Sequence, residues 1–368
     1  MPKNSTLQIQ NMVRELGEQL GFISVIEERM HDNNAYAPIY DAVWYLDLTK
    51  YFDIDALMPI FINAPKFLLK LKKLPVAGFE IEGASTSSKN QLGNFANLYS
   101  GHFLYNFVIV NNGAANGEND TYRRGRKLYK YFYEEHGAKD TVFMDFTHFY
   151  ESVKNLKVLD TKIHKEIYIS EKRKICGGDV TSDEMYNSLY PYLKKSGFEI
   201  KQNYSPVMPK IKYHEENTSL NDSENKTANF KTGRFFRKEP TNYDWNIARK
   251  PSDMYYIPKL DTVLGFNLPS SFYGWLSALS LALNYENVSY PILYGVNKKI
   301  IEQIFVPIVG IEFENSINKH CNGGIVNLSH YSYYGILVGN ESADSHIRFL
   351  KENMGINNVT YLALGELK

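Results

Sequence analysis

The chain contains two diverged copies of one sequence unit, and this repeat constrains its fold more than any other feature. Residues 74–82 read LPVAGFEIE and residues 306–314 read VPIVGIEFE, so a proline, a glycine and two glutamates coincide at an offset of 232. Residues 36–49 (YAPIYDAVWYLDLT) and 256–269 (YIPKLDTVLGFNLP) coincide in the same way at an offset of 220. A repeat of this kind indicates that one supersecondary unit has been copied within the chain.

Three more pairs of segments resemble each other in the same chain order: 94–112 and 324–340, 126–144 and 346–362, and, more faintly near the start of each unit, 16–22 and 193–198. Five ordered pairs with drifting offsets favour an ancient duplication with later loop insertions. We therefore predict a first domain over 1–155, a polar, Lys-rich linker over 156–183 and a second domain over 184–368. Residues 205–250 have no counterpart in the first unit and are predicted to be an insertion in the second domain.

Each unit is predicted to fold as a layered mixture of helices and strands. In the first unit, apolar residues recur at helical spacing over 7–20, and residues 53–71, 90–99 and 123–136 are also expected to be helical. Residues 36–49 alternate and are rich in aromatic and β-branched side chains, which is typical of a strand. With further strands over 75–82 and 102–110, the expected class is α/β, a mixed α+β sheet flanked by helices, present as two tandem domains.

Composition excludes some classes of protein. A hydrophobic content of 43% with 22% charged residues is that of a folded, soluble chain. The chain has no run of eighteen apolar residues, so no membrane span is expected, and the first ten residues lack an apolar signal core, which favours a cytoplasmic location. Cys176 and Cys321 are too few for a zinc site and are expected to be free thiols. Because 41 basic residues balance 41 acidic ones, any binding of nucleic acid would depend on local basic clusters.

The glutamates of the repeat predict a metal site. Glu80 and Glu82 alternate with Phe79 and Ile81, so the two carboxylates share one face of a strand while the apolar side chains point into the core. If the strand that carries Asp41 pairs alongside, three carboxylates meet, and they repel one another unless a hard cation such as Mg²⁺ lies among them. A single such strand could equally be an amphipathic strand with its glutamates in solvent. The second copy keeps the carboxylates although its flanks have diverged, which favours a site: Asp261, Glu312 and Glu314.

An aspartate followed by Glu-x-Glu on a neighbouring strand, and then by a helix, resembles the PD-(D/E)xK nuclease superfamily. The segment FEIEGASTSSKNQLGNFANL is similar to the FEVE-x-S…NL signature of type II restriction endonucleases. The resemblance covers about 7–150 and 185–365. It implies hydrolysis of phosphodiester bonds in double-stranded DNA, Mg²⁺ as cofactor and a cognate DNA methyltransferase as partner. It also implies the metal ligands, which are Asp41, Glu80, Asp261 and Glu312.

Two departures from that family concern the catalytic residues. Tyr40, not proline, precedes Asp41. Glu82 and Glu314 stand where the family usually has lysine, and these carboxylates could orient the attacking water. Alternatively, a lysine from the following helix could enter each site, although both candidates could be ordinary surface residues: Lys89 and Lys319.

Two basic segments could contact DNA. The first, TYRRGRKLYKYFY over 121–133, combines cationic side chains that neutralise phosphates with tyrosines, and it could also be a solvated amphipathic helix. The second lies in the predicted insertion, where loops often carry recognition, and it could also be an exposed loop without a role. The candidate residues are Arg123, Arg124, Arg126, Lys127, Arg234, Arg237, Lys238 and Arg249.

Together these features predict a site-specific type II restriction endonuclease in which each module cuts one strand. A homodimer supplies two such sites by symmetry, whereas this chain carries both covalently and could act as a monomer. The alternatives are another DNA-processing nuclease (repair, transposition or nicking), a nuclease directed at RNA, and a DNA-binding protein whose carboxylates are vestigial.

Overall fold

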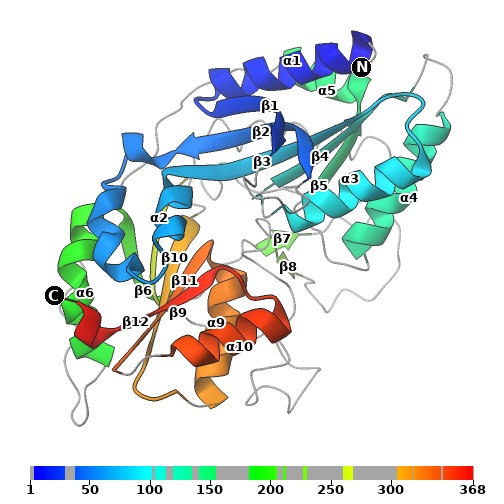
Figure 1. The fold of residues 1–368 in the computed structure, drawn as a ribbon. Helices are drawn as coiled ribbons and strands as arrows, with labels where there is room; N and C mark the ends of the chain where they lie inside the picture. The colour runs from blue at the N-terminus through cyan, green and yellow to red at the C-terminus, as the bar shows by residue number, and fades with distance from the viewer. Residues whose placement is uncertain are drawn as a thin grey trace.

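The computed structural model describes residues 4–29, 38–101, 103, 105–112, 119–134, 141–154, 182–204, 210–212, 227–229, 260–267, 305–317, 319–340 and 343–367. These residues form two five-stranded mixed sheets flanked by helices, which confirms the expected mixture of helices and strands (Figure 1). Within these ranges, no helix has the length and apolarity needed to cross a membrane. We call residues 4–154 the first module and residues 182–367 the second module.

The first module is built on a sheet with strand order β1-β2-β3-β4-β5. Strands β1, β2 and β3 are antiparallel neighbours, whereas β3, β4 and β5 run parallel to one another. Its elements are α1 (Asn4–Gln19), β1 (Ile23–Arg29), β2 (Ile39–Asp47), η1 (Leu48–Lys50), η2 (Ile54–Phe61), α2 (Pro65–Lys72), β3 (Lys73–Glu82), α3 (Ser88–Ser100), β4 (Tyr105–Val110), α4 (Asp120–Glu134), β5 (Thr141–Asp145) and α5 (Phe146–Lys154).

The second module repeats this sheet as β6-β9-β10-β11-β12, with the same pattern of antiparallel and parallel pairs. Its elements are α6 (Ser182–Ser196), β6 (Glu199–Tyr204), β9 (Leu260–Asn267), β10 (Phe305–Glu314), α9 (Lys319–Tyr331), β11 (Tyr334–Gly339), α10 (Asp344–Met354), β12 (Val359–Ala363) and η4 (Leu364–Glu366). Two short strands pair separately, β7 (Lys210–Lys212) and β8 (Thr227–Asn229), and both lie in the predicted insertion.

The two sheets agree in register as well as in strand order. Val43 pairs with Gly78 in the first module, and Val263 pairs with Gly310 in the second, at the offsets of the sequence repeat. The pairing shifts by one residue at the same place in each, between 75 and 77 on β3 and between 307 and 309 on β10. Because a shift of one residue turns every following side chain to the other face, this common bulge gives the two Glu-x-Glu segments the same orientation.

The structure differs from the sequence prediction in three local respects. Strands β1 and β5 were not predicted, and the expected helix over 53–71 is divided into η2 and α2. The division follows from two prolines, since Pro59 lies inside the 3₁₀ segment and Pro65 begins α2, where a missing N–H costs nothing. Helix α6 begins at Ser182, inside the predicted linker, of which residues 156–181 lie outside the described part.

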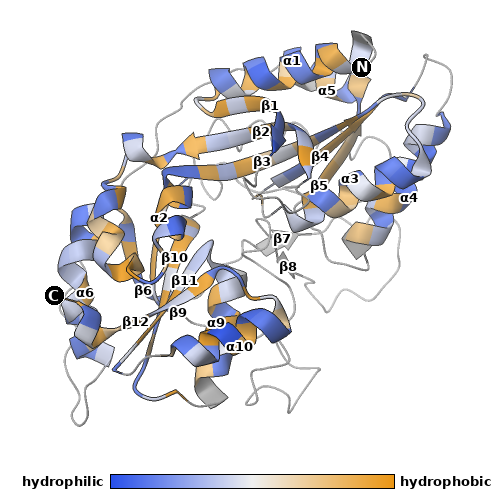
Figure 2. Cartoon of the chain, in the orientation of Figure 1, coloured by the Kyte–Doolittle hydropathy of each residue, from blue (hydrophilic) through white to orange (hydrophobic). Residues whose placement is uncertain are grey.

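The first sheet has a different set of helices on each face. Helices α1 and α5 cover one face, where Trp44 and Phe79 are fully buried and the Trp44 indole donates a hydrogen bond to the carbonyl of Val13 at 3.1 Å. Helices α3 and α4 cover the other face, packing against Val43 and Val108. Figure 2 shows β4 hydrophobic along most of its length, whereas α1 and α4 alternate hydrophobic and hydrophilic residues, as expected of helices packed on one side.

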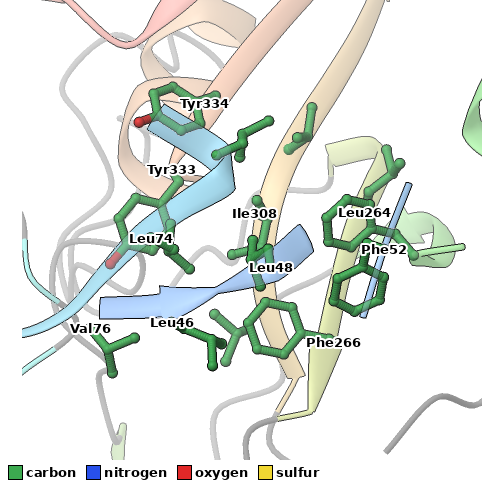
Figure 3. Close-up of a cluster of buried hydrophobic side chains, with 14 of the residues drawn as sticks. Leu46, Leu48, Phe52, Leu74, Val76, Leu264, Phe266, Ile308, Tyr333 and Tyr334 are labelled. Carbon is green, nitrogen blue, oxygen red and sulfur yellow. The ribbon is translucent and has the colours of Figure 1, made fainter. Parts of the chain in front are cut away.

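The two modules share a continuous hydrophobic core (Figure 3). Phe52, which follows η1, stacks on Phe198 with ring centroids 4.1 Å apart and lies 5.7 Å from Phe266 of β9. The hydroxyl of Tyr333 donates to the carbonyl of Pro75 at 2.5 Å, which ties the second sheet to β3. The segment between β2 and β3, together with Pro75 of β3, therefore contacts the second module.

Phe52→Ala should lower the free energy of unfolding by about 3–5 kcal/mol, since it removes a buried aromatic ring and leaves a cavity between the modules. Chemical denaturation measures this change. Leu69→Ala is the matched control, because the Leu69 side chain on α2 is 65% exposed and its loss should change stability by less than about 0.5 kcal/mol. Equal effects of the two substitutions would contradict a shared core.

Candidate carboxylate sites

In the first module, the sheet register brings Asp41 beside Glu80. Ala42 on β2 pairs with Phe79 on β3, so the preceding position on β2 faces the following position on β3. The side chain of Asp41 crosses to β3, where Oδ2 accepts a hydrogen bond from the backbone N–H of Ile81 at 2.6 Å. Its other oxygen, Oδ1, accepts from Nε2 of Gln10 on α1 at 3.0 Å. Both oxygens of Asp41 are thus held by the fold.

The second module reproduces this arrangement. Thr262 pairs with Ile311, as Ala42 pairs with Phe79 in the first module. Oδ2 of Asp261 accepts from the backbone N–H of Phe313 at 2.9 Å, which is the same bond at the repeat-related residue. The two Asp–Glu pairs are therefore equivalent in register and in the way that the aspartate is anchored.

Each central glutamate is buried next to its aspartate. Burial, then the charges of Asp41 and Glu82, raise the pKa of Glu80 well above its ordinary value of 4.5. Burial and the charge of Asp261 raise the pKa of Glu312 well above the same value. Glu80 is only 3% exposed, and among the described residues its Oε1 atom has no hydrogen-bond partner. A buried carboxylate in this setting requires either a proton or a cation.

The third carboxylates differ between the modules. Glu82 is 1% exposed, and its Oε1 accepts from Nδ2 of Asn94 on α3 at 2.8 Å. Burial raises the pKa of Glu82, while hydrogen bonds from Thr86 and Asn94 and the charge of Arg124 oppose this rise.

Glu314, the counterpart of Glu82, is half-buried at the end of β10. Burial, followed by the charge of Asp261, raises its pKa. Burial and the nearby Glu314 charge also raise the pKa of the buried Cys321 thiol to about 12. Cys321 is a free thiol, as the sequence predicts, and Cys176 lies outside the described residues.

In the part of the chain that the structure describes, no three Asp, Glu, His or Cys side chains come together as a ready-made set of metal ligands. The three carboxylates of each module nevertheless lie near one another, since the charges of Asp41 and Glu82 both raise the pKa of Glu80, and those of Asp261 and Glu314 both raise the pKa of Glu312. In each module the strand register fixes the Asp–Glu pair. Such a pair still fits Mg²⁺, which is usually bound by one or two carboxylates and completes its octahedral shell with waters and phosphate oxygens. The unpartnered Oε1 of Glu80 is the atom that such an ion would satisfy.

The two candidate lysines are not seen to join the carboxylates. Lys89 is exposed on the first turn of α3. Lys319 begins α9, but its side chain lies outside the described part of the chain. The sequence analysis did not predict that Gln10 would bind Asp41 or that Asn94 would bind Glu82. Asn94 lies on α3, within the segment that resembles the restriction-enzyme signature.

The basic residues of α4 occupy unlike positions. Arg124 turns inward, where it donates to the carbonyl of Thr86 at 2.7 Å and to Oε1 of Gln91 at 3.3 Å. Arg123 is exposed and paired with Asp120. Lys127 is exposed and Arg126 is half-buried. The remaining four candidates lie outside the described residues: Arg234, Arg237, Lys238 and Arg249.

Comparisons with known proteins return no match to a family model, to a curated protein or to a solved structure.

Proposed function

We propose that the chain is a Mg²⁺-dependent endonuclease of the PD-(D/E)xK type that cuts double-stranded DNA at a specific sequence, as type II restriction enzymes do. One observation carries the proposal: an Asp–Glu pair lies on adjacent antiparallel strands, with the aspartate anchored to the same backbone N–H, in both modules. Burying ionisable groups beside each other costs free energy, and apolar replacements are often neutral or stabilising. Retention of the pair in two diverged copies therefore favours a functional role for these carboxylates over a vestigial one.

Within each site, the carboxylates and the backbone would have different roles. Asp41 with Glu80, and Asp261 with Glu312, would hold the cation, which would polarise the scissile phosphate and lower the pKa of the attacking water. The backbone N–H groups of Ile81 and Phe313 fix the aspartates, so that these ligands need little reorganisation.

The pairing of two sites in one chain supports a cut in both strands by one molecule. The modules have the same sheet topology and share a core, so the two sites are held on one body. Exposed cations on α4, including Lys127, would neutralise DNA phosphates, while Arg124 would position Thr86 and its loop. A cognate methyltransferase and a cytoplasmic location belong to the same proposal, because a restriction enzyme must spare the DNA of its own cell.

Incubation of supercoiled plasmid with the protein and Mg²⁺ tests this function. We expect discrete linear fragments, and we expect excess EDTA to abolish them. The Asp41→Ala, Asp261→Ala double variant is the control, since it lacks the aspartate of each pair but keeps every side chain of the hydrophobic core. A smear of products would indicate a nonspecific nuclease, whereas cleavage that persists in EDTA, or in the double variant, would contradict the proposed sites.

A further inference from the structure

The two carboxylate sites differ at one helix position that faces the third glutamate. In the first module this position on α3 is Asn94, and in the second the repeat places Gly324 on α9. The flanking residues confirm the correspondence, because Phe95 and Leu98 are buried in one helix as Ile325 and Leu328 are in the other. The two helices therefore pack in the same way and differ in the side chain at this position.

Asn94 holds the Glu82 carboxylate by a hydrogen bond in the first module. Its Nδ2 donates to Oε1 of Glu82 at 2.8 Å, and Glu82 is 1% exposed. The Thr86 loop that also contacts Glu82 is itself held by Arg124, which donates to the Thr86 carbonyl at 2.7 Å. To turn toward Asp41 and Glu80, the Glu82 carboxylate would have to give up these partners while it remains buried.

Gly324 has no side chain with which to hold Glu314 in the second module. A Cβ atom at this position would lie 3.6 Å from Oε1 of Glu314 and 3.7 Å from Cγ of Glu312. Glu314 is only half-buried, so its carboxylate has room and solvent in which to rotate. The distances also show that Glu312 and Glu314 line the same space beside α9.

We propose that Asn94 and Gly324 make the two sites unequal, an inference that rests on the proposed binding of a divalent cation by each Asp–Glu pair. Asn94 is a positioning residue that withholds Glu82 from the cation, leaving Asp41 and Glu80 as its carboxylate ligands. Glu314 joins Asp261 and Glu312 when a cation binds. Since the affinity of an oxygen-ligand site rises with the number of charged ligands, the second module binds the divalent cation more tightly.

Calorimetric titration of the full chain with Ca²⁺, without DNA, tests the inference separately from cleavage. We expect two classes of site that differ in affinity by about tenfold or more. Asp261→Asn should remove the tighter class, and Asp41→Asn the weaker one. Absence of any Ca²⁺ binding would overturn the proposed function together with this inference. Two sites that bind Ca²⁺ with equal affinity would overturn the inference alone.

Substitutions at Gly324 and Asn94 provide the decisive variants. Gly324→Asn should weaken the tighter class by about tenfold, because the new amide can hold Glu314 as Asn94 holds Glu82. Gly324→Ala is the matched control and should change little, since a Cβ at 3.6 Å makes ordinary contact and leaves the chain able to fold. Asn94→Ala should strengthen the weaker class by releasing Glu82. If Gly324→Asn and Asn94→Ala both left the affinities unchanged, the hydrogen bond from Asn94 would have no role and the inference would be wrong.

Discussion

Asp41→Ala should convert the protein from one that linearises supercoiled plasmid into one that nicks a single, defined strand. The substitution removes the anchored carboxylate of the first pair, and the loss of such charge stabilisation should slow cutting by that module at least about 10²-fold. The second pair keeps its own strands and its own backbone anchor on Phe313, so it should continue to cut. Asp261→Ala should nick the opposite strand.

Gel separation of supercoiled, nicked and linear plasmid, followed by sequencing across the nick, measures this division of labour. Asp55→Ala is a suitable control, because Asp55 is an exposed carboxylate paired with Lys72 at 2.9 Å, away from the two pairs. A single variant that still linearised plasmid at the full rate would identify its mutated site as vestigial. Loss of all nicking in both single variants would show instead that the modules form one coupled site.

The repeat in the sequence predicts much of what positions the sites. The Pro-x-x-Gly-x-Glu-x-Glu pattern places its glutamates on one face because strand side chains alternate, and the structure shows Phe79 and Ile81 buried on the opposite face. The aspartate strand does lie alongside in both modules, as the matched segments suggest. These features depend on local periodicity and on strand neighbours, which a repeat preserves.

Other features depend on tertiary contacts that local patterns do not encode. Strand β1 (ISVIEER) is a half-buried edge strand without clean alternation, and β5 (TVFMD) is five residues long. The core shared by the modules depends on Phe52 meeting Phe198, two residues far apart in the chain. The inward orientation of Arg124 is likewise set by Thr86 and Gln91, so a basic cluster in the sequence does not distinguish a DNA contact from an internal brace.

In the absence of divalent cations, the thermal stability of the protein should fall as the pH rises above about 4.5, the ordinary pKa of a glutamate carboxyl group. Burial raises the pKa of Asp41, Glu80, Glu82, Glu312 and Glu314 in the folded protein. A carboxyl group whose folded pKa is raised contributes stability that is fully present below its unfolded pKa, near 4.5 for glutamate, and lost as the pH rises through the folded value. The buried pairs thus oppose folding most at neutral and alkaline pH.

Mg²⁺ or Ca²⁺ should reverse this loss, because a cation takes the place of the proton that each buried pair otherwise requires and binds only the folded state. At a concentration one hundred times its dissociation constant, each bound cation should add about 2.7 kcal/mol to the free energy of unfolding. Thermal unfolding at pH 5.5 and pH 8, with Ca²⁺ or with EDTA, measures the effect. Glu80→Gln keeps the shape of the buried side chain without its charge, so it should stabilise the cation-free protein at pH 8 and reduce the gain from Ca²⁺. A gain that was equal at both pH values and unchanged by Glu80→Gln would show that the cation binds elsewhere.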